Sequence, residues 1–336
     1  MASGFFGRRW VRVVLIILAV IAVLALSLVI ALCIAYGHRS DPSDVKHYQT
    51  TNPFIAENGS LIVAHRAGAG IAPEATMMGF RLCIEDPDFD VDLVEFDLHI
   101  TKDNILVLLH DEDLDRVSDC QEVFGKEGCR PEDYTFEELR QLNMGAKFVT
   151  DDGKKPYAGL KGDAVPDELK VLSLDMILDY LESMGCRAII EVKNSGELGK
   201  RSVDILYRTL KERNMLDSVL FGTFDKEIAR YKDEAYPDLI RCAYGMEVFV
   251  FYLNAIFGLR NYDPDFGVLA LPFHEESDLH FNLGTATLVN YAHAHDIAVQ
   301  YWTVNDAEEM EYLMSIGADG ITTDYPDVAY DVREDK

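Results

Sequence analysis

The feature that most constrains the fold is an alternation of short apolar segments with longer amphipathic ones along nearly the whole chain. Parallel strands need helical crossovers of this kind, so the pattern predicts an α/β protein with a closed (β/α)8 barrel, a TIM barrel. An open, doubly wound sheet is the alternative, but no glycine-rich phosphate turn follows the first strand. The eight predicted strands are residues 61–65, 93–100, 188–193, 218–224, 239–244, 267–272, 297–304 and 319–324.

One interval interrupts this alternation. After the second predicted strand and its extension, about 55 residues rich in glycine and proline pass before the next clear helix begins at Ser173. A short helix is expected within the interval at 135–142, because Thr135 is a suitable N-cap and Glu138 completes a capping box. We therefore predict a small insertion after strand two, at about 112–170. Because it follows the carboxyl end of a strand, it is expected to lie over the mouth of the barrel.

The start of the chain differs from the rest. Val13 to Tyr36 form 24 residues without charge, enough at about 1.5 Å per residue to span a bilayer core of roughly 30 Å. A cleaved signal peptide is the main alternative, but its apolar region is usually shorter and ends in a small-x-small site, which is not evident here. Arg8, Arg9 and Arg12 precede the segment, so the positive-inside rule predicts a cytoplasmic N-terminus and an extracytoplasmic body.

These patterns predict a single-pass protein of the cell membrane. Its expected parts are a cytoplasmic N-terminus at 1–12, a transmembrane signal anchor at 13–36, a stalk at 37–58 and the barrel at 59–336.

The charge of the chain limits its partners. Lys and Arg number 31 against 58 Asp and Glu, which gives a formal net charge of −27. Residues 1–40 contain only basic charges, so the negative charge belongs to the body of the protein. Such a surface repels a phosphate backbone, and we therefore expect no nucleic-acid partner.

Two of the six cysteines, Cys120 and Cys129, lie in one loop rich in glycine and charge. In an extracytoplasmic domain they are candidates for a disulfide, and two free thiols are the alternative. The chain has neither a C-x-x-C motif nor the spacing of a zinc site.

Acidic side chains recur toward the carboxyl ends of predicted strands, where barrels place their sites. Glu95 and Asp97 are two residues apart on the second strand, so both point to the same face, and Glu191 lies on the next parallel strand. Carboxylates facing inward are costly unless positive charge lies between them. Three hard oxygen ligands predict one divalent cation, Mg²⁺ or Ca²⁺, rather than zinc.

Basic and aromatic side chains occupy the same strand ends. His65 and Arg66 follow the first strand, and His110 follows an extension of the second. Lys193 ends the third strand and Trp302 lies on the seventh. Arg66 and Lys193 suit a phosphate group, and the two histidines suit an acid–base pair across it. A single histidine at a strand end is more often structural, but the recurrence of charged residues at these ends favours a site.

Five motifs spread over roughly residues 60–330 together resemble those of the glycerophosphodiester phosphodiesterases. They read AHRAGAGIAPEAT, VEFDLHITKDNILVLLHDEDLDR, IIEVK, YWTVND and GADGITTDYP. The resemblance implies a TIM barrel with a small insertion after the second strand, and one divalent cation. The residues it implies are metal ligands Glu95, Asp97 and Glu191, catalytic His65 and His110, phosphate contacts Arg66 and Lys193, Trp302 lining the site, and Glu74 near the metal.

Two positions depart from the commonest pattern of that family. Ala67 replaces the glycine of an HRG motif, and Ala75 replaces the asparagine of a PENT motif. Ala67 restricts the backbone at a tight turn without removing a functional group, whereas Ala75 removes an amide. Because the implied metal ligands and both histidines are present, we expect an active enzyme. His99 shares the face of Glu95 and Asp97, and we expect it to be a hydrogen-bonded barrel residue.

The reaction that the resemblance implies is metal-dependent hydrolysis of glycerophosphodiesters to glycerol 3-phosphate and an alcohol. The nucleophile is either water or the 2-hydroxyl of the substrate. A lysophospholipase D acting on lysophospholipids is the first alternative, supported by the apolar segment 246–259, although a barrel helix explains that segment more simply. A non-catalytic, membrane-tethered binder of glycerophosphate polymers is the second. The expected partners are therefore a small glycerophosphodiester or a lysophospholipid, and the membrane through the N-terminal helix.

Overall fold

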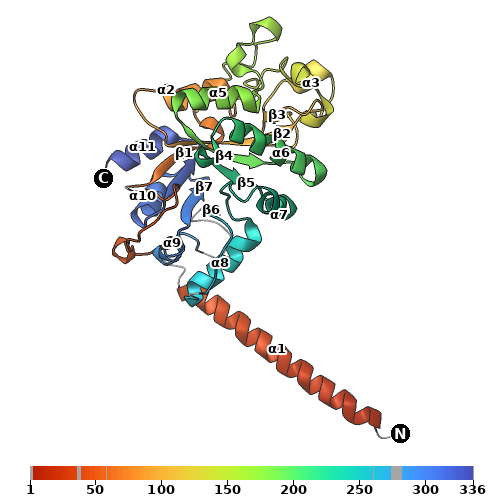
Figure 1. Cartoon of the computed structure of the whole chain (residues 1–336), viewed down its shortest axis with the longest axis vertical. Coiled ribbons are helices and arrows are strands. Elements are labelled where there is room, and N and C mark those ends of the chain that lie inside the picture. Colours follow the sequence, from red (N-terminus) through yellow and green to blue (C-terminus); the bar gives the residue numbers. More distant parts are fainter. Residues whose placement is uncertain (1–2, 36–38, 58, 260, 274–281, 336) are drawn as a thin grey trace.

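The structure, a computed structural model, describes residues 3–35, 39–57, 59–259, 261–273 and 282–335. Its first element is the helix α1 (Ser3–Ala35), which runs away from the rest of the protein (Figure 1). Within it, Trp10–Ala31 is long and apolar enough to cross a membrane. The predicted boundaries between anchor, stalk and barrel, at 36–38 and at 58, lie outside the described residues.

After α1, parallel strands form a closed barrel. Seven are continuous, and they pair in the order β5-β4-β2-β1-β8-β7-β6. The ring closes through two parallel bridges, Phe221 with Arg241 and Cys242 with Val268, so the predicted strand at 239–244 is present as a short link. The prediction of a (β/α)8 fold is therefore confirmed. The strands are β1 (Leu61–Ala64), β2 (Leu93–Ile100), β4 (Arg187–Val192), β5 (Val219–Gly222), β6 (Val268–Pro272), β7 (Ala298–Trp302) and β8 (Gly320–Thr323).

Helices surround the barrel, each with an apolar face against the strands (Figure 1). Local signals set their ends: Ser173 accepts a hydrogen bond from the Met176 amide at the start of α5, and Gly185 ends that helix at φ 65°. The helices are α2 (Met77–Glu85), α5 (Leu174–Met184), α6 (Gly196–Glu212), α7 (Lys226–Ala235), α8 (Gly245–Phe257), α9 (Ala286–His293), α10 (Ala307–Ser315) and α11 (Pro326–Glu334).

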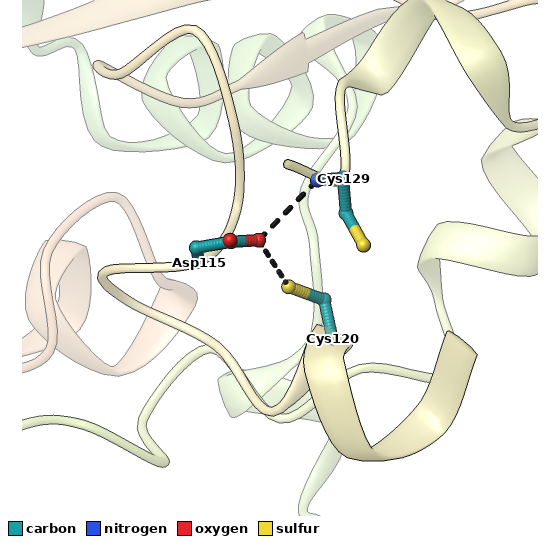
Figure 2. Close-up of side chains that lie close together, drawn as sticks. All are labelled: Asp115, Cys120 and Cys129. Carbon is teal, nitrogen blue, oxygen red and sulfur yellow. Dashed lines mark hydrogen bonds between the residues drawn. The ribbon is translucent and has the colours of Figure 1, made fainter. Parts of the chain in front are cut away.

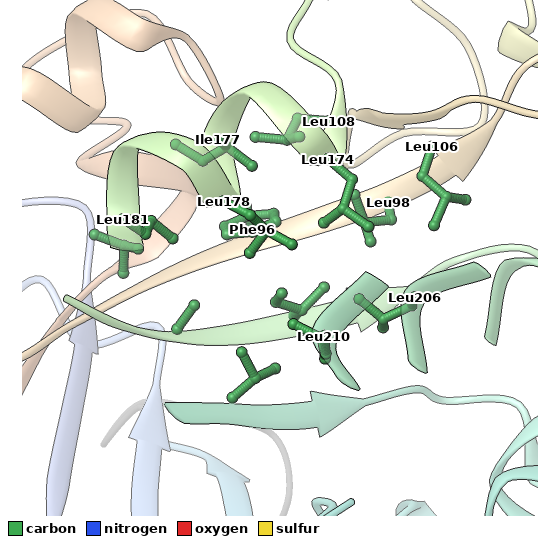
Figure 3. Close-up of a cluster of buried hydrophobic side chains, with 14 of the residues drawn as sticks. Phe96, Leu98, Leu106, Leu108, Leu174, Ile177, Leu178, Leu181, Leu206 and Leu210 are labelled. Atoms are coloured by element: carbon green, nitrogen blue, oxygen red, sulfur yellow. The ribbon is translucent and has the colours of Figure 1, made fainter. Parts of the chain in front are cut away.

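Figure 3 shows how this packing works around β2. Phe96 and Leu98 are fully buried on the outer face of the strand, beneath apolar side chains of α5 such as Leu178, while Leu206 and Leu210 of α6 lie on the other side of the same cluster. Alternate residues of β2 therefore serve different purposes. The outward-facing side chains pack against helices, and the inward-facing side chains line the barrel interior.

The segment that we expect to be a stalk lies, in its described part, against the barrel. The backbone amide of Thr51 donates to Asp296, and Asn52 Nδ2 donates to the carbonyl of Gly267. Phe54 is fully buried among the inward-facing residues Val63, Leu93, Ile189, Leu220, Val268 and Ala298. It therefore closes the amino-terminal end of the barrel with an apolar side chain, a role that a solvated stalk does not have.

The chain between β2 and α5 forms a separate apolar cluster. Here β3 (Leu106–Leu108) pairs antiparallel with the end of β2, and the short helices α3 (Cys120–Phe124) and α4 (Phe136–Leu139) follow. The predicted capping box of Thr135 and Glu138 begins α4. Because the cluster has its own buried residues, the segment is a packed structure and not an open loop.

Candidate active site

The period of two along the strands divides the barrel interior into an apolar layer and a polar layer. Leu93 and Ile189 point into the lower layer above Phe54, and Glu95, Glu191 and Gln300 point into the layer above it. The polar layer opens into a cavity of about 140 Å³ at the carboxyl ends of the strands. Sites of this fold form at that end.

Four charged groups occupy one side of the cavity. Asp97 and Glu191 are cross-strand neighbours, and Lys193 Nζ lies 3.4 Å from Asp97 Oδ1 and 2.9 Å from Glu191 Oε1. Burial, followed by the charge of Glu191, raises the pKa of Asp97 to about 7. Burial and the neighbouring Asp97 raise the pKa of Glu95 well above its ordinary value. The charges of Lys193 and Arg66 lower the pKa of Asp97 without offsetting burial and the charge of Glu191.

The three predicted metal ligands line the same cavity without converging as tightly as a liganded set. In the described part of the chain, one group of three acidic, histidine or cysteine ligand atoms lies within 4.8 Å of one another, and it is Asp115, Cys120 and Cys129. The chemistry of Glu95, Asp97 and Glu191 nevertheless fits a hard divalent cation, because all three supply oxygen and need more positive charge.

His65 enters the cavity from the turn after β1. Its Nδ1 lies 2.7 Å from Asp324 Oδ1, and its Nε2 lies 3.9 Å from Glu95 Oε2. Because a carboxylate only accepts hydrogen bonds, Asp324 places the proton on Nδ1 and leaves Nε2 toward the cavity. Asn305 holds the second oxygen of Asp324 at 2.8 Å. Burial raises the pKa of Asp324, but the hydrogen bond and charge of His65 outweigh it, so the pKa is lowered.

The hairpin of β2 and β3 brings His110 back over the cavity. The Leu109 amide donates to the carbonyl of Asp97 at 3.1 Å, and the next residue, His110, therefore lies above that strand. His110 Nδ1 is 2.8 Å from Asp111 Oδ1, so this ring is oriented in the same way as His65. Burial lowers the pKa of His110, and the charges of Arg66 and Lys193 lower it further against the opposing effect of Asp111.

Glu74 supports this arrangement from the edge of the cavity. It accepts two hydrogen bonds from Arg116, at 2.7 and 2.8 Å, and lies 3.7 Å from Arg66. Arg116 also binds Asp111 through Nε. A chain of ion pairs therefore joins Arg66 through Glu74 and Arg116 to Asp111, the carboxylate that orients His110. Glu74 thus lies beside two arginines and not among the three predicted metal ligands.

Two buried polar groups in the cavity wall have no hydrogen-bond partner within the described structure. They are the Nε group of Arg66 and the whole amide of Gln300, both buried. An unpaired buried polar group costs about 1–3 kcal/mol, so the two groups are expected to bind polar atoms of a ligand. Trp302 lies across from Phe224, with ring centroids 5.7 Å apart, and the two rings form an aromatic edge of the cavity.

The predicted residues therefore come together, with Glu74 in the neighbouring cavity and Lys193 paired with Asp97 and Glu191 beside the central one. The remaining predicted residues line the central cavity. Sequence reasoning missed the orienting roles of Asp111 and Asp324, the link through Arg116 and the buried amide of Gln300. The dipeptide His-Asp at 110–111 and an aspartate directly after a strand were signals for the first two. No sequence pattern identifies Arg116 as part of the site, because the fold of the insertion determines which carboxylates it binds.

His99 is buried outside this cavity. Its Nδ1 lies 3.4 Å from Asn194 Nδ2, and its Nε2 has no partner among the described residues. Burial lowers its pKa to about 4, so the ring is neutral near pH 7. The structure thus places His99 in the barrel wall.

The segment between β1 and α2 is strained at Arg66 and at both positions where the sequence departs from the common pattern. Arg66, Ala67 and Ala75 all have positive φ, at 48°, 62° and 53°. This conformation costs a residue other than glycine about 1–2 kcal/mol. The strained turn directs the Arg66 amide to Glu95 Oε2 at 2.9 Å, which holds one carboxylate of the site in place.

A larger cavity of about 670 Å³ lies at the amino-terminal end of the barrel, next to Pro53, Asp233 and Arg241. It contains none of the predicted site residues. In this fold that end serves stability, so the smaller cavity is the candidate active site.

Comparison with known proteins agrees with the geometry. Residues 65–328 match the model of the Glycerophosphoryl diester phosphodiesterase family. The chain is 28% identical over 268 residues to the glycerophosphodiester phosphodiesterase of Caldanaerobacter subterraneus subsp. tengcongensis, which covers 80% of this chain and 95% of that one.

Solved structures show the same fold. A phosphodiesterase of Oleispira antarctica in complex with the product sn-glycerol-3-phosphate has a TM-score of 0.61 at 20% identity and covers 82% of this chain and 97% of its own. A glycerophosphodiester phosphodiesterase of Agrobacterium tumefaciens has a TM-score of 0.60 at 18% identity, with coverages of 81% and 99%. The family match spans most of the barrel, and the chain therefore belongs to the glycerophosphoryl diester phosphodiesterase family of enzymes.

Proposed function

We propose that the protein hydrolyses glycerophosphodiesters to glycerol 3-phosphate and an alcohol, with His65 and His110 as the acid–base pair. The observation that carries the proposal is that two histidines, each held at Nδ1 by a carboxylate, line one cavity with three further carboxylates. Beside a phosphate, one oriented imidazole can take a proton from the attacking hydroxyl, and the other can give a proton to the leaving alcohol oxygen.

Glu95, Asp97 and Glu191 are the residues that would hold a divalent cation, Mg²⁺ or Ca²⁺. Such an ion supplies positive charge that stabilises the developing charge on phosphate oxygens. Burial and the neighbouring carboxylates raise the pKa of Glu95 and of Asp97, and this supports the assignment, because a cation bound here would offset both effects. Arg66 and Lys193 provide further positive charge for the phosphate.

Proton transfer follows from the free Nε2 atoms. One histidine takes the proton of the attacking hydroxyl, which belongs to water or to the 2-hydroxyl of the substrate, as the new P–O bond forms. The other histidine, which carries a proton on Nε2 as imidazolium before the step, gives that proton to the alcohol oxygen as the old P–O bond breaks. In the second route a cyclic phosphate forms first, and water opens it with the two roles exchanged. Asp324 and Asp111 stabilise the imidazolium formed at each step.

A lysophospholipid is the second candidate substrate, and the surface of α8 favours it. Met246, Val250 and Phe257 are exposed and lie, with the half-buried Leu253, on one stripe at spacings of four, seven and eleven residues. The single acidic residue of this helix, Glu247, is paired with Arg241. Val29, near the end of α1, packs on the apolar cluster that contains the buried face of α8 (Figure 1). The stripe is therefore placed to meet the same membrane as α1.

A comparison of two substrates tests both candidates. We expect turnover of glycerophosphocholine to be lost on chelation and to be unaffected by Met246→Asp. If lysophosphatidylcholine in vesicles is also a substrate, Met246→Asp should lower its kcat/KM by about 10-fold, the cost of removing one apolar side chain from the interface. Met184→Asp is the matched control, because Met184 is also exposed but lies on α5. Equal loss in both variants would contradict a membrane-facing role, and no turnover of either substrate would contradict the proposed function.

We also propose that α1 anchors the protein with its N-terminus in the cytoplasm and the barrel outside. The three arginines before the apolar segment support this orientation. Protease added to intact cells is then expected to remove the barrel and leave a membrane fragment. Protection of the barrel until the cells are lysed would mean that the orientation is reversed.

A further inference from the structure

The insertion carries a second cluster of reactive side chains, away from the carboxylates of the barrel. Asp115, Cys120 and Cys129 converge from both ends of one loop, and their ligand atoms lie within 4.8 Å of one another (Figure 2). Both thiols are fully buried. The two sulfur atoms therefore lie next to each other. Gly125 and Gly128, which both have positive φ, lie in the chain between the two cysteines.

The hydrogen bonds of Asp115 show what holds this loop together. Its two oxygens accept from the Gly128 amide at 2.7 Å, the Cys129 amide at 3.3 Å, Gln121 Nε2 at 3.3 Å and the Cys120 thiol at 3.1 Å. The Gly128 amide and the other donors lower the pKa of Asp115 to about 2. A carboxylate with four donors has no lone pair free for a cation, so Asp115 is a structural acceptor.

The thiols are poorly suited to hold a metal in this setting. With Asp115 engaged by its four donors, only two sulfur ligands remain in this group of the described residues, whereas a structural zinc site has four ligands. Formation of a disulfide would remove only one of the four donors to Asp115, the Cys120 thiol. The backbone amides of Gly128 and Cys129 would continue to hold the loop.

We propose that Cys120 and Cys129 form a disulfide in the mature protein. The inference rests on the extracytoplasmic orientation proposed above, because disulfides persist in oxidising compartments. One thiolate attacks a disulfide of a protein or small-molecule oxidant, forming a mixed disulfide and releasing a thiol. The second thiolate attacks the mixed disulfide, closes the bridge and releases the second thiol, so the oxidant takes up both electrons and both protons. Because the thiols are buried in the packed loop, this exchange takes place while the loop folds.

The bridge would steady the ion-paired chain at the active site. The Leu114 amide donates to the Cys129 carbonyl at 3.0 Å, so the loop is tied to the backbone two residues before Arg116. Arg116 in turn binds Glu74 and Asp111. A disulfide that closes the loop therefore restricts the segment that positions the partner of His110.

Peptide mapping of the full-length protein, extracted from membranes with a thiol-blocking reagent present, tests the bridge directly. Trypsin cleaves after Lys126, which lies between the two cysteines, so Val117–Lys126 and Glu127–Arg140 remain joined only through a disulfide. We expect this joined pair at a mass lower than the sum of its parts by two hydrogen atoms, and its separation on reduction. Cys186 is expected to carry the blocking group. Blocked thiols at both Cys120 and Cys129 would overturn the proposal.

A stability measurement provides a second, independent test. Reduction is expected to lower the Tm of the wild type by about 5 °C, as for the loss of a short-loop disulfide. The variant with Cys120→Ala and Cys129→Ala should show no response to reductant, whereas Cys186→Ala should respond like the wild type. If the purified protein contains one zinc ion per chain and both cysteines are free of a disulfide, the proposal is wrong and the cluster is a metal site. Failure of the purified, reduced protein to close the bridge with oxidised glutathione during refolding would overturn the geometric argument independently of the orientation.

Discussion

Replacing either His65 or His110 by alanine is expected to lower kcat on glycerophosphodiesters by about 100-fold or more, the range usual for general acid–base groups. Each ring is held at Nδ1 by its own carboxylate, so its contribution is to proton transfer in the transition state and not to the fold. Steady-state kinetics, with metal affinity measured by calorimetric titration, tests this. Metal affinity should change little. His47→Ala is the matched control, because His47 is exposed and outside the cavity.

The two histidines should behave as one unit. The variant that lacks both rings should lose much less activity than the product of the two single losses, because the first replacement already interrupts the proton path. A nitrophenyl phosphodiester, whose leaving group needs no proton, should restore activity to the variant that lacks the general acid and not to the one that lacks the base. This comparison assigns the two roles. If both single variants keep near-normal kcat while Glu95→Ala is inactive, the acid–base pair is wrong and only the metal assignment survives.

Removal of divalent cations is expected to abolish activity, and addition of Mg²⁺ or Ca²⁺ to restore it. Glu191→Gln should weaken metal affinity and kcat together by about 100-fold, because an amide supplies the same oxygen without its charge. The reason is the burial of three carboxylates in one cavity, which raises the pKa of Glu95 and of Asp97 and which a bound cation would offset.

Activity before and after exhaustive chelation, with calorimetric titration of each cation, is the measurement. Glu197→Gln is the control, because Glu197 is an exposed carboxylate at the start of α6. Full activity of the chelated wild type would remove the metal from the mechanism. Loss of activity in Glu191→Gln without a change in metal affinity would give Glu191 another role, as the partner of Lys193.

Much of the barrel could be predicted because its strands are marked locally. Alternation along β2 sets Phe96 and Leu98 outward and Glu95 and Asp97 inward, whatever the rest of the chain does. The sequence also predicts a strand at 239–244. In the structure this segment pairs with its neighbours through one bridge on each side, at Arg241 and Cys242. The polar composition of residues 37–58 gives no sign that one ring within it, Phe54, is buried against the barrel.

The amino-acid sequence specifies which side chains face the interior and which of them bear charge, because a strand's period of two is a property of the backbone. It thereby determined the composition of the candidate site. The pairing of those groups depends on the folded barrel: Asp324 pairs with His65, Arg116 with Glu74, and Lys193 with both Asp97 and Glu191. Most of these contacts join residues far apart in the chain. Closure of the barrel brings them together, and no local pattern records the distance between two strand ends.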